Sequence, residues 1–330
     1  MDELVDRLDD LQRRHRALGI PLAVIYKFFD DQGNYLAAII TYYTFVAIFP
    51  LLLIGSSVLG FLLQGNTDLQ QQILNSALAQ FPIVGTQLGT PEGLQGSTSA
   101  VVVGALAATY GILGLGQAAQ NAINVAWAVP RNSRLNPFVS RVRSFLLFIL
   151  GGLSLLALAV LSSVASHLEV FSAEIGLGVR WLLTLVSVAV TALVLSVMMT
   201  LATPEHHRLR IVLPGGVAVA VMWQALQQVG GVYVSQVINR AGEMNGVFAL
   251  VLGLIALLYI GAVMAMLGIQ INVVLAKELY PRALLAPFSD DVDLTEADRR
   301  VYTDYAKAQR HKGFQHVTVT FRPESADTEP

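Results

Sequence analysis

The chain of 330 residues contains no cysteine, which excludes disulfide bonds, thiolate metal ligands and thiol catalysis. Charge is scarce too, since Asp, Glu, Lys and Arg make up 13% of the residues, against roughly 25% in soluble domains. The net charge of −2 and the dispersed basic residues argue against a surface for nucleic acid. Residues 1–16 carry charges of both signs and lack the apolar segment of a cleavable signal peptide.

Apolar residues are abundant instead, at 54% of the chain with a mean hydropathy of +0.59. Six long runs contain no Asp, Glu, Lys or Arg between their ends, and each is long enough to cross a bilayer as a helix. The runs lie near 35–63, 99–129, 143–166, 181–203, 211–235 and 246–276. The sequence therefore predicts an all-α integral membrane protein, a bundle of six transmembrane helices occupying residues 35–276.

The positions of the basic residues predict the orientation. All of the 21 Lys and Arg residues except Arg180 and Arg240 fall on one side of the predicted membrane. Because Lys and Arg concentrate in cytoplasmic segments, we expect both termini to be cytoplasmic. A multi-pass protein of the bacterial inner membrane is the predicted location.

Three segments outside the runs are predicted to have their own structure. The arm, residues 1–34, holds an apolar stretch at 18–31 that is too short to span and fits an interfacial helix. The extracytoplasmic loop 64–98 has helical spacing, which fits an amphipathic helix on the bilayer or bundle, or an ordinary packed loop helix. In the tail, 277–330, Thr295 and Asp298 predict a capping box that starts a helix over about 295–312, followed by disorder.

Side-chain amides form stripes in two of the runs. On a helix, Gln117, Gln120, Asn121 and Asn124 fall within an arc of roughly 100°, so they face one direction. Gln224, Gln227 and Gln228 repeat this spacing in the fifth run, which suggests two helices presenting amides to one interior. Two interpretations remain open: amides and glycines that hold helices together, or the lining of a polar path. Glycines in the second run are also places where that long helix could bend or break.

No catalytic, metal or cofactor site is expected. The histidines lie in the arm, a short loop and the tail, where solvated side chains are the simpler interpretation, and no ionisable group lies inside a run. Arg131, Arg134, Arg141 and Arg143 cluster after the second run. They follow from the positive-inside rule alone, or they form a seat for anionic lipid headgroups.

The first run, NYLAAIITYYTFVAIFPLLLIGSSVLG (34–60), resembles the first conserved block of the YihY/BrkB membrane proteins, formerly mislabelled ribonuclease BN. The later segments 121–145, 213–226 and 267–279 are similar to further blocks of that family, and the YhjD-like branch is the most similar. The resemblance covers about residues 20–285 and implies an inner-membrane protein of six helices without an established enzymatic activity. The sequence departs from many relatives at Gln270, where a glutamate often precedes Asn272, so an ion-driven mechanism loses support.

The sequence is consistent with two functions. In the first, the chain is a transporter or flippase-like protein for a lipid or other amphiphile of the cell envelope. Its predicted path is lined by Tyr42, Tyr43, Gln117, Gln120, Asn121, Asn124, Gln224, Gln227, Gln228, Gln270 and Asn272, and Pro50 kinks the first helix. In the second, the bundle is an inert scaffold that recruits envelope-assembly proteins. Membrane lipids are the expected partners, nucleic acid is not, and the oligomeric state is left open.

Overall fold

The computed structural model describes residues 2–62, 98–171, 177–203, 208–236, 243–287 and 292–321. Within these ranges the secondary structure is helical and contains no strand. Six helices of 26 to 35 residues overlap the six predicted runs. They are α3 (Gly33–Leu62), α5 (Thr98–Ala126), α6 (Pro137–Phe171), α7 (Leu177–Ala202), α8 (Leu209–Gln236) and α9 (Glu243–Ala276).

Four of these helices contain a described stretch long and apolar enough to cross a membrane. The stretches are Pro137–Ser154, Thr184–Ala202, Leu209–Gln227 and Val251–Ala276, and a shorter apolar stretch covers Gly33–Ile48 of α3. Hydrocarbon offers no hydrogen-bond partners to the backbone, whereas a helix pairs its backbone groups internally. The chain is thus an all-helical protein with membrane-crossing helices.

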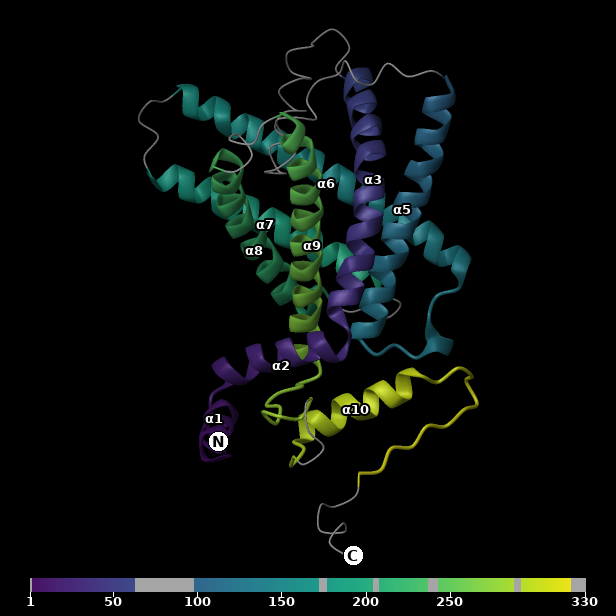
Figure 1. Ribbon diagram of the computed structural model, residues 1–330, viewed down its shortest axis with the longest axis vertical. Helices are drawn as coiled ribbons and strands as arrows, with labels where there is room; N and C mark the ends of the chain where they lie inside the picture. The colour runs from purple at the N-terminus through teal and green to yellow at the C-terminus, as the bar shows by residue number, and fades with distance from the viewer. Residues whose placement is uncertain are drawn as a thin grey trace, which may run out of the picture.

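The six long helices pack as a closed ring, in the order α5, α3, α9, α8, α7 and α6, with α6 returning to α5. Each helix makes its most extensive contacts with its two neighbours in this ring. Figure 1 shows α9 and α3 side by side near the middle of the bundle. Helices α5 and α8 are therefore not ring neighbours, although their amide patterns match.

Small residues let these helices approach closely. A Cβ added at Gly111 of α5 would lie 2.9 Å from the backbone nitrogen of Ala47 in α3. A Cβ at Gly215 of α8 would collide with the carbonyl oxygen of Gly268 in α9. Because lipid tails are as apolar as leucine, such close backbone contact is a principal source of helix association in membranes.

Three shorter helices lie at one end of the ring, here called the basal end. They are α1 (Asp2–Arg14), α2 (Arg16–Asp30) and α10 (Glu296–Ala308). Figure 1 shows α2 crossing beneath the ends of the long helices, with α10 below it. Helix α2 packs on α9, and α1 packs on α2. The expected capping box is present at the start of α10, where Thr295 and Asp298 bond reciprocally.

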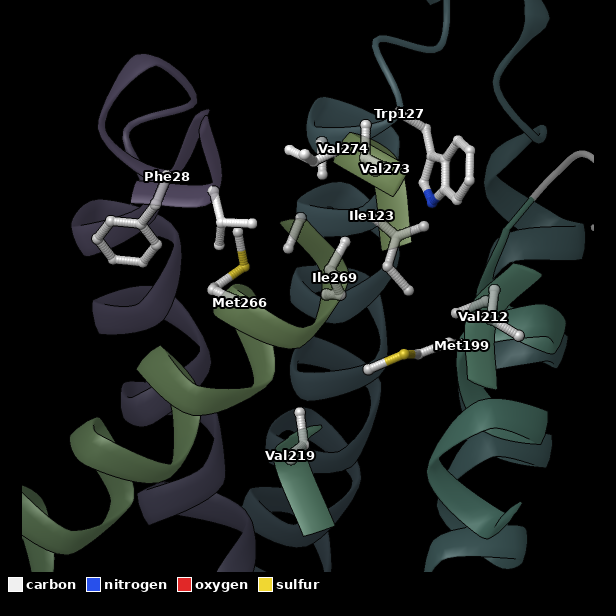
Figure 2. Close-up of a cluster of buried hydrophobic side chains, with 14 of the residues drawn as sticks. Phe28, Ile123, Trp127, Met199, Val212, Val219, Met266, Ile269, Val273 and Val274 are labelled. Carbon is white, nitrogen blue, oxygen red and sulfur yellow. The ribbon is translucent and has the colours of Figure 1, made fainter. Parts of the chain in front are cut away.

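An apolar core joins the basal end to the ring. Phe28 of α2 is buried in the same cluster as Met266, Ile269 and Val273 of α9, while Trp127 follows α5 (Figure 2). Burial of such side chains contributes roughly 1.5–3 kcal/mol each against exposure to water. The core therefore fixes α2 across the base of α9, which positions the polar groups described below.

Some predictions fall at or beyond the limits of the description. The amphipathic helix expected within 64–98 and the expected disorder at the end of the tail lie outside the described residues. Pro50 lies within α3, but its side chain is not among those described. The break considered for the second run is not observed, because α5 continues as one helix from Thr98 to Ala126 through all its glycines.

Candidate functional site

The amide stripe on α5 is divided by the packing of the helix. Gln120 and Asn124 are buried, whereas Gln117 and Asn121 are exposed. The four amides therefore do not share one environment, and a path lined by all of them stays a prediction. Their environments differ because α6 covers only one edge of the stripe, where Gly116 lets Ser144 approach.

Gln120 joins α5 to α6. Its Nε2 donates to the Ser144 hydroxyl at 2.8 Å and to the Ser140 carbonyl at 3.0 Å. Its Oε1 accepts from the Ser140 hydroxyl at 3.1 Å. This amide is used in interhelical hydrogen bonds, which are the packing interpretation of the stripe. Asn124 differs, because its buried Oδ1 has no hydrogen-bond donor within the described part of the chain.

The exposed members form a polar surface that we call the α5 stripe: Tyr110, Gln117 and Asn121. At about 100° per residue these three side chains lie within an arc of roughly 40°. Tyr110 is 56% exposed, and its ring lies 5.7 Å from that of Tyr43. Tyr43 in turn contacts the exposed Tyr42 at 5.1 Å between ring centroids. At its basal end the stripe meets Arg134, whose Nη1 donates to Asn121 Oδ1 at 3.3 Å.

The arginines after α5 serve several contacts. Arg131 donates to Gln309, just beyond α10, and Arg143 donates to the Thr203 carbonyl at the end of α7 at 2.7 Å. Arg134 also bonds the Val129 carbonyl, and partial burial lowers its pKa from the ordinary value. Arg141 is exposed. The structure thus places Arg134 at the foot of the stripe and gives Arg131 and Arg143 contacts that join helices.

Asn272 of α9 fastens α9 to α8. Its Oδ1 accepts from the backbone N–H of Gly215 at 2.7 Å, and its Nδ2 contacts the sulfur of Met199 at 3.4 Å. The fifth-run amides Gln224 and Gln227 are half-buried, and the Gln228 side chain is not among those described.

Gln270 of α9 reaches a buried ion pair at the basal end. Its Nε2 donates to Asp31 Oδ2 at 2.7 Å, and Lys27 Nζ lies 2.5 Å from the same oxygen. The ammonium of Lys27 also lies 4.8 Å from the centroid of the Tyr305 ring of α10. Burial lowers the pKa of Lys27 and raises the pKa of Asp31, and in each case the charge of the partner opposes the shift. Burial, together with the negative charge of Asp31, raises the pKa of Tyr305.

A second ion-pair group, centred on Arg282, holds α10 in place. Arg282 is fully buried and pairs with Asp298 of α10 and, at 2.9 Å, with Asp30 of α2. The Gln12 amide of α1 donates to the Arg282 carbonyl at 2.6 Å. Sequence reasoning missed both ion-pair groups, although the i, i+4 spacing of Lys27 and Asp31 was an available signal.

Comparison with known proteins places this arrangement in one family. A sequence model of the family described as Virulence factor BrkB matches residues 24–291, which cover all six long helices. No curated protein and no solved structure gives a significant match to the chain.

Proposed function

Because the chain belongs to the family of membrane proteins described as Virulence factor BrkB, we propose that it moves a lipid or another amphiphilic envelope component across a membrane. The observation that carries the proposal is the α5 stripe. Gln117 and Asn121 expose their amides on a helix that is otherwise strongly apolar. Polar groups at membrane depth are costly and mark pathways when they are not used in packing.

The length of the α5 stripe is about half the thickness of a membrane's hydrocarbon core. Eleven residues separate Tyr110 from Asn121, which corresponds to about 16 Å along the helix, or roughly half of a 30 Å hydrocarbon core. A headgroup moving along it exchanges water for the amides of Gln117 and Asn121, while its acyl chains remain in lipid. Arg134 supplies a positive charge where a phosphate enters. Transport of this kind involves no catalytic step and no cofactor.

In this proposal the six long helices all cross the bacterial inner membrane, and the basal end with both termini is cytoplasmic. The distribution of Lys and Arg supports that orientation. The absence of cysteine allows a clean test, because Arg14→Cys and Arg310→Cys each introduce a single thiol. An impermeant maleimide should label both in inverted vesicles and neither in intact spheroplasts. Labelling of both thiols in intact spheroplasts would show that the orientation is the opposite of the proposed one.

Transport is tested in vesicles that contain the purified protein and a fluorescent lipid quenched from outside. Gln117→Leu with Asn121→Leu should slow lipid exchange between leaflets about tenfold, as expected for losing one or two hydrogen bonds at the barrier. Leu182→Met with Leu185→Met, at exposed positions on α7, is the matched control. Exchange equal to that of protein-free vesicles, or unchanged by the α5 substitutions, would exclude the path.

The second candidate is a scaffold for envelope-assembly proteins. It is favoured by the use of Gln120 and Asn272 in interhelical contacts rather than in a cavity. Loss of lipid exchange in every preparation, combined with an intact fold, would select this alternative.

A further inference from the structure

A cavity of about 190 Å³ lies at the corner where α1 meets α2, away from the α5 stripe. Its lining includes Gln12, Arg13, Arg14, Arg16, Gly19 and Tyr280. All of these except Tyr280 precede residue 24, where the family match begins, and Pro281 completes the lining. Most of the cavity lining therefore lies outside the residues that the family match covers.

The cavity is positively charged. Arg13 forms an ion pair with Asp9 at 2.7 Å. Arg14 pairs only weakly with Asp10, because the two charged groups are 4.0 Å apart and both side chains are exposed. Arg16 lies over the Tyr280 ring, 6.0 Å from its centroid, without a carboxylate partner in the described structure. Arg16 also begins α2, whose first turn is not capped by any side chain. The positive end of the helix dipole there favours an anion.

Gln12 indicates that the ligand of this cavity carries a hydrogen-bond donor, because the side-chain oxygen of Gln12 lacks one in the described part of the chain. Its side chain is 5% exposed and its Nε2 is already committed to Asp9 and to the Arg282 carbonyl. Its Oε1, in contrast, has no donor within the described residues. A Cβ at Gly19 would lie 3.4 Å from this oxygen, so the oxygen stands at the cavity wall that Gly19 leaves open. A ligand that fits is an anion carrying its own O–H or N–H donor.

The surroundings indicate that this anion is attached to a lipid. Leu18, Pro21, Ile25 and Phe29 are exposed along one face of α2, directly after the arginines. An apolar face of this kind, with basic residues at its end, is typical of a helix lying in the headgroup region of a bilayer. The cavity then lies at headgroup level.

We infer that the α1–α2 corner binds the headgroup of an anionic glycerophospholipid of the phosphatidylglycerol type. Arg14, Arg16 and the start of α2 hold the phosphate, and a glycerol hydroxyl donates to Gln12 Oε1. A zwitterionic headgroup brings an ammonium group against the arginines and is disfavoured. Phosphatidic acid lacks the headgroup glycerol, so no glycerol hydroxyl can donate to Gln12, and it should bind more weakly above the second pKa of its phosphate.

The test measures binding of short-chain lipids to the full-length protein in detergent by native mass spectrometry. The probes are dioctanoyl phosphatidylglycerol, phosphatidic acid and phosphatidylcholine, together with glycerol 3-phosphate, which lacks acyl chains. Arg14→Gln with Arg16→Gln should weaken phosphatidylglycerol binding about thirtyfold, whereas Arg299→Gln with Arg300→Gln, on α10, should leave it unchanged. Arg14→Gln alone removes an exposed side chain and cannot prevent folding, so it is measured separately and should weaken binding severalfold.

Gln12→Met retains the shape of the side chain and should abolish the preference for phosphatidylglycerol over phosphatidic acid. Equal losses in the α1–α2 and α10 variants would overturn the site. Binding of glycerol 3-phosphate as tight as that of phosphatidylglycerol would overturn its assignment to lipid. Because Gln117 and Asn121 lie elsewhere, their substitution should not change binding, so this inference is independent of the transport proposal.

Discussion

Lys27 Nζ lies 2.5 Å from Asp31 Oδ2, and the two side chains are only 3% and 0% exposed. They sit four residues apart at the junction between α2 and α3, covered by Gln270 of α9 and Tyr305 of α10. Three parts of the chain, the end of α2, α9 and α10, thus meet around one ion pair. Its removal should therefore be felt as a change in stability of the whole basal end.

Lys27→Met keeps most of the volume of the side chain but leaves the Asp31 carboxylate buried without its cation. We expect a loss of about 3–5 kcal/mol in unfolding free energy, as for other buried pairs that lose one member. The control is Arg299→Met, which removes an exposed arginine of α10 without an ion pair among the described residues and should leave the melting temperature unchanged. Equal melting temperatures for the two variants in detergent would contradict a structural role of the buried pair.

The raised pKa of Asp31 predicts a dependence of stability on pH. Between the ordinary value of 3.8 and the raised native value, the folded state binds a proton that the unfolded state releases. Asp31 should therefore make the protein more stable as the pH falls through the native pKa. The measurement is the difference in melting temperature between the wild type and Asp31→Asn from pH 7 to pH 4. A difference that stays constant over this range would show that the carboxyl group does not titrate in the native state.

Gln120 and Gln117 separate the packing and path interpretations of the α5 amides. Gln120→Leu leaves Ser140 and Ser144 without their amide partner and should cost about 1–2 kcal/mol of stability. Gln117→Leu, three residues earlier on the exposed face, should leave stability unchanged while slowing lipid exchange. Thermal unfolding and lipid exchange measured on both variants should give opposite rankings. The same ranking in both assays would mean that the two residues do not have distinct roles.

Gly215 is predicted to be essential for the contact between α8 and α9. Gly215→Ala places a methyl group against the Gly268 carbonyl oxygen and the Asn272 amide, and should destabilise the protein by about 2 kcal/mol or more. Gly152→Ala on α6 is the control, because no atom lies within 4 Å of the added Cβ. Denaturation of both variants in detergent provides the comparison, and a Gly215→Ala variant as stable as Gly152→Ala would refute the close approach.

Local patterns were sufficient to predict most of the described helices, although α1 was not among those expected. The six long helices follow from uncharged apolar runs, and the start of α10 follows from the spacing of Thr295 and Asp298. Such features depend only on residues within a few turns of one another. The helix expected at 18–31 likewise corresponds to α2, whose apolar composition and single lysine are local properties, while its position at the membrane interface stays a prediction.

The division of the α5 stripe could not be predicted, because it depends on which helix covers which edge. Gln117 and Gln120 are the same residue type, three positions apart, and have similar neighbours in the sequence. Only the approach of Ser144 to Gly116 decides that one amide is buried and the other is not. The burial of Lys27 and Arg282 was hidden for the same reason, since side chains of α10 contact both and Arg282 also pairs with Asp30 of α2.

The placement of α10 has a consequence for biogenesis. Arg282 joins Asp30, made early by the ribosome, to Asp298, made near the end of synthesis. Until α10 emerges, Arg282 has Asp30 but lacks Asp298, its second carboxylate partner among the described residues. The contact between the basal end and α10 therefore forms after the long helices have been made, and nascent chains arrested before residue 298 should expose Arg282 to protease or chaperone.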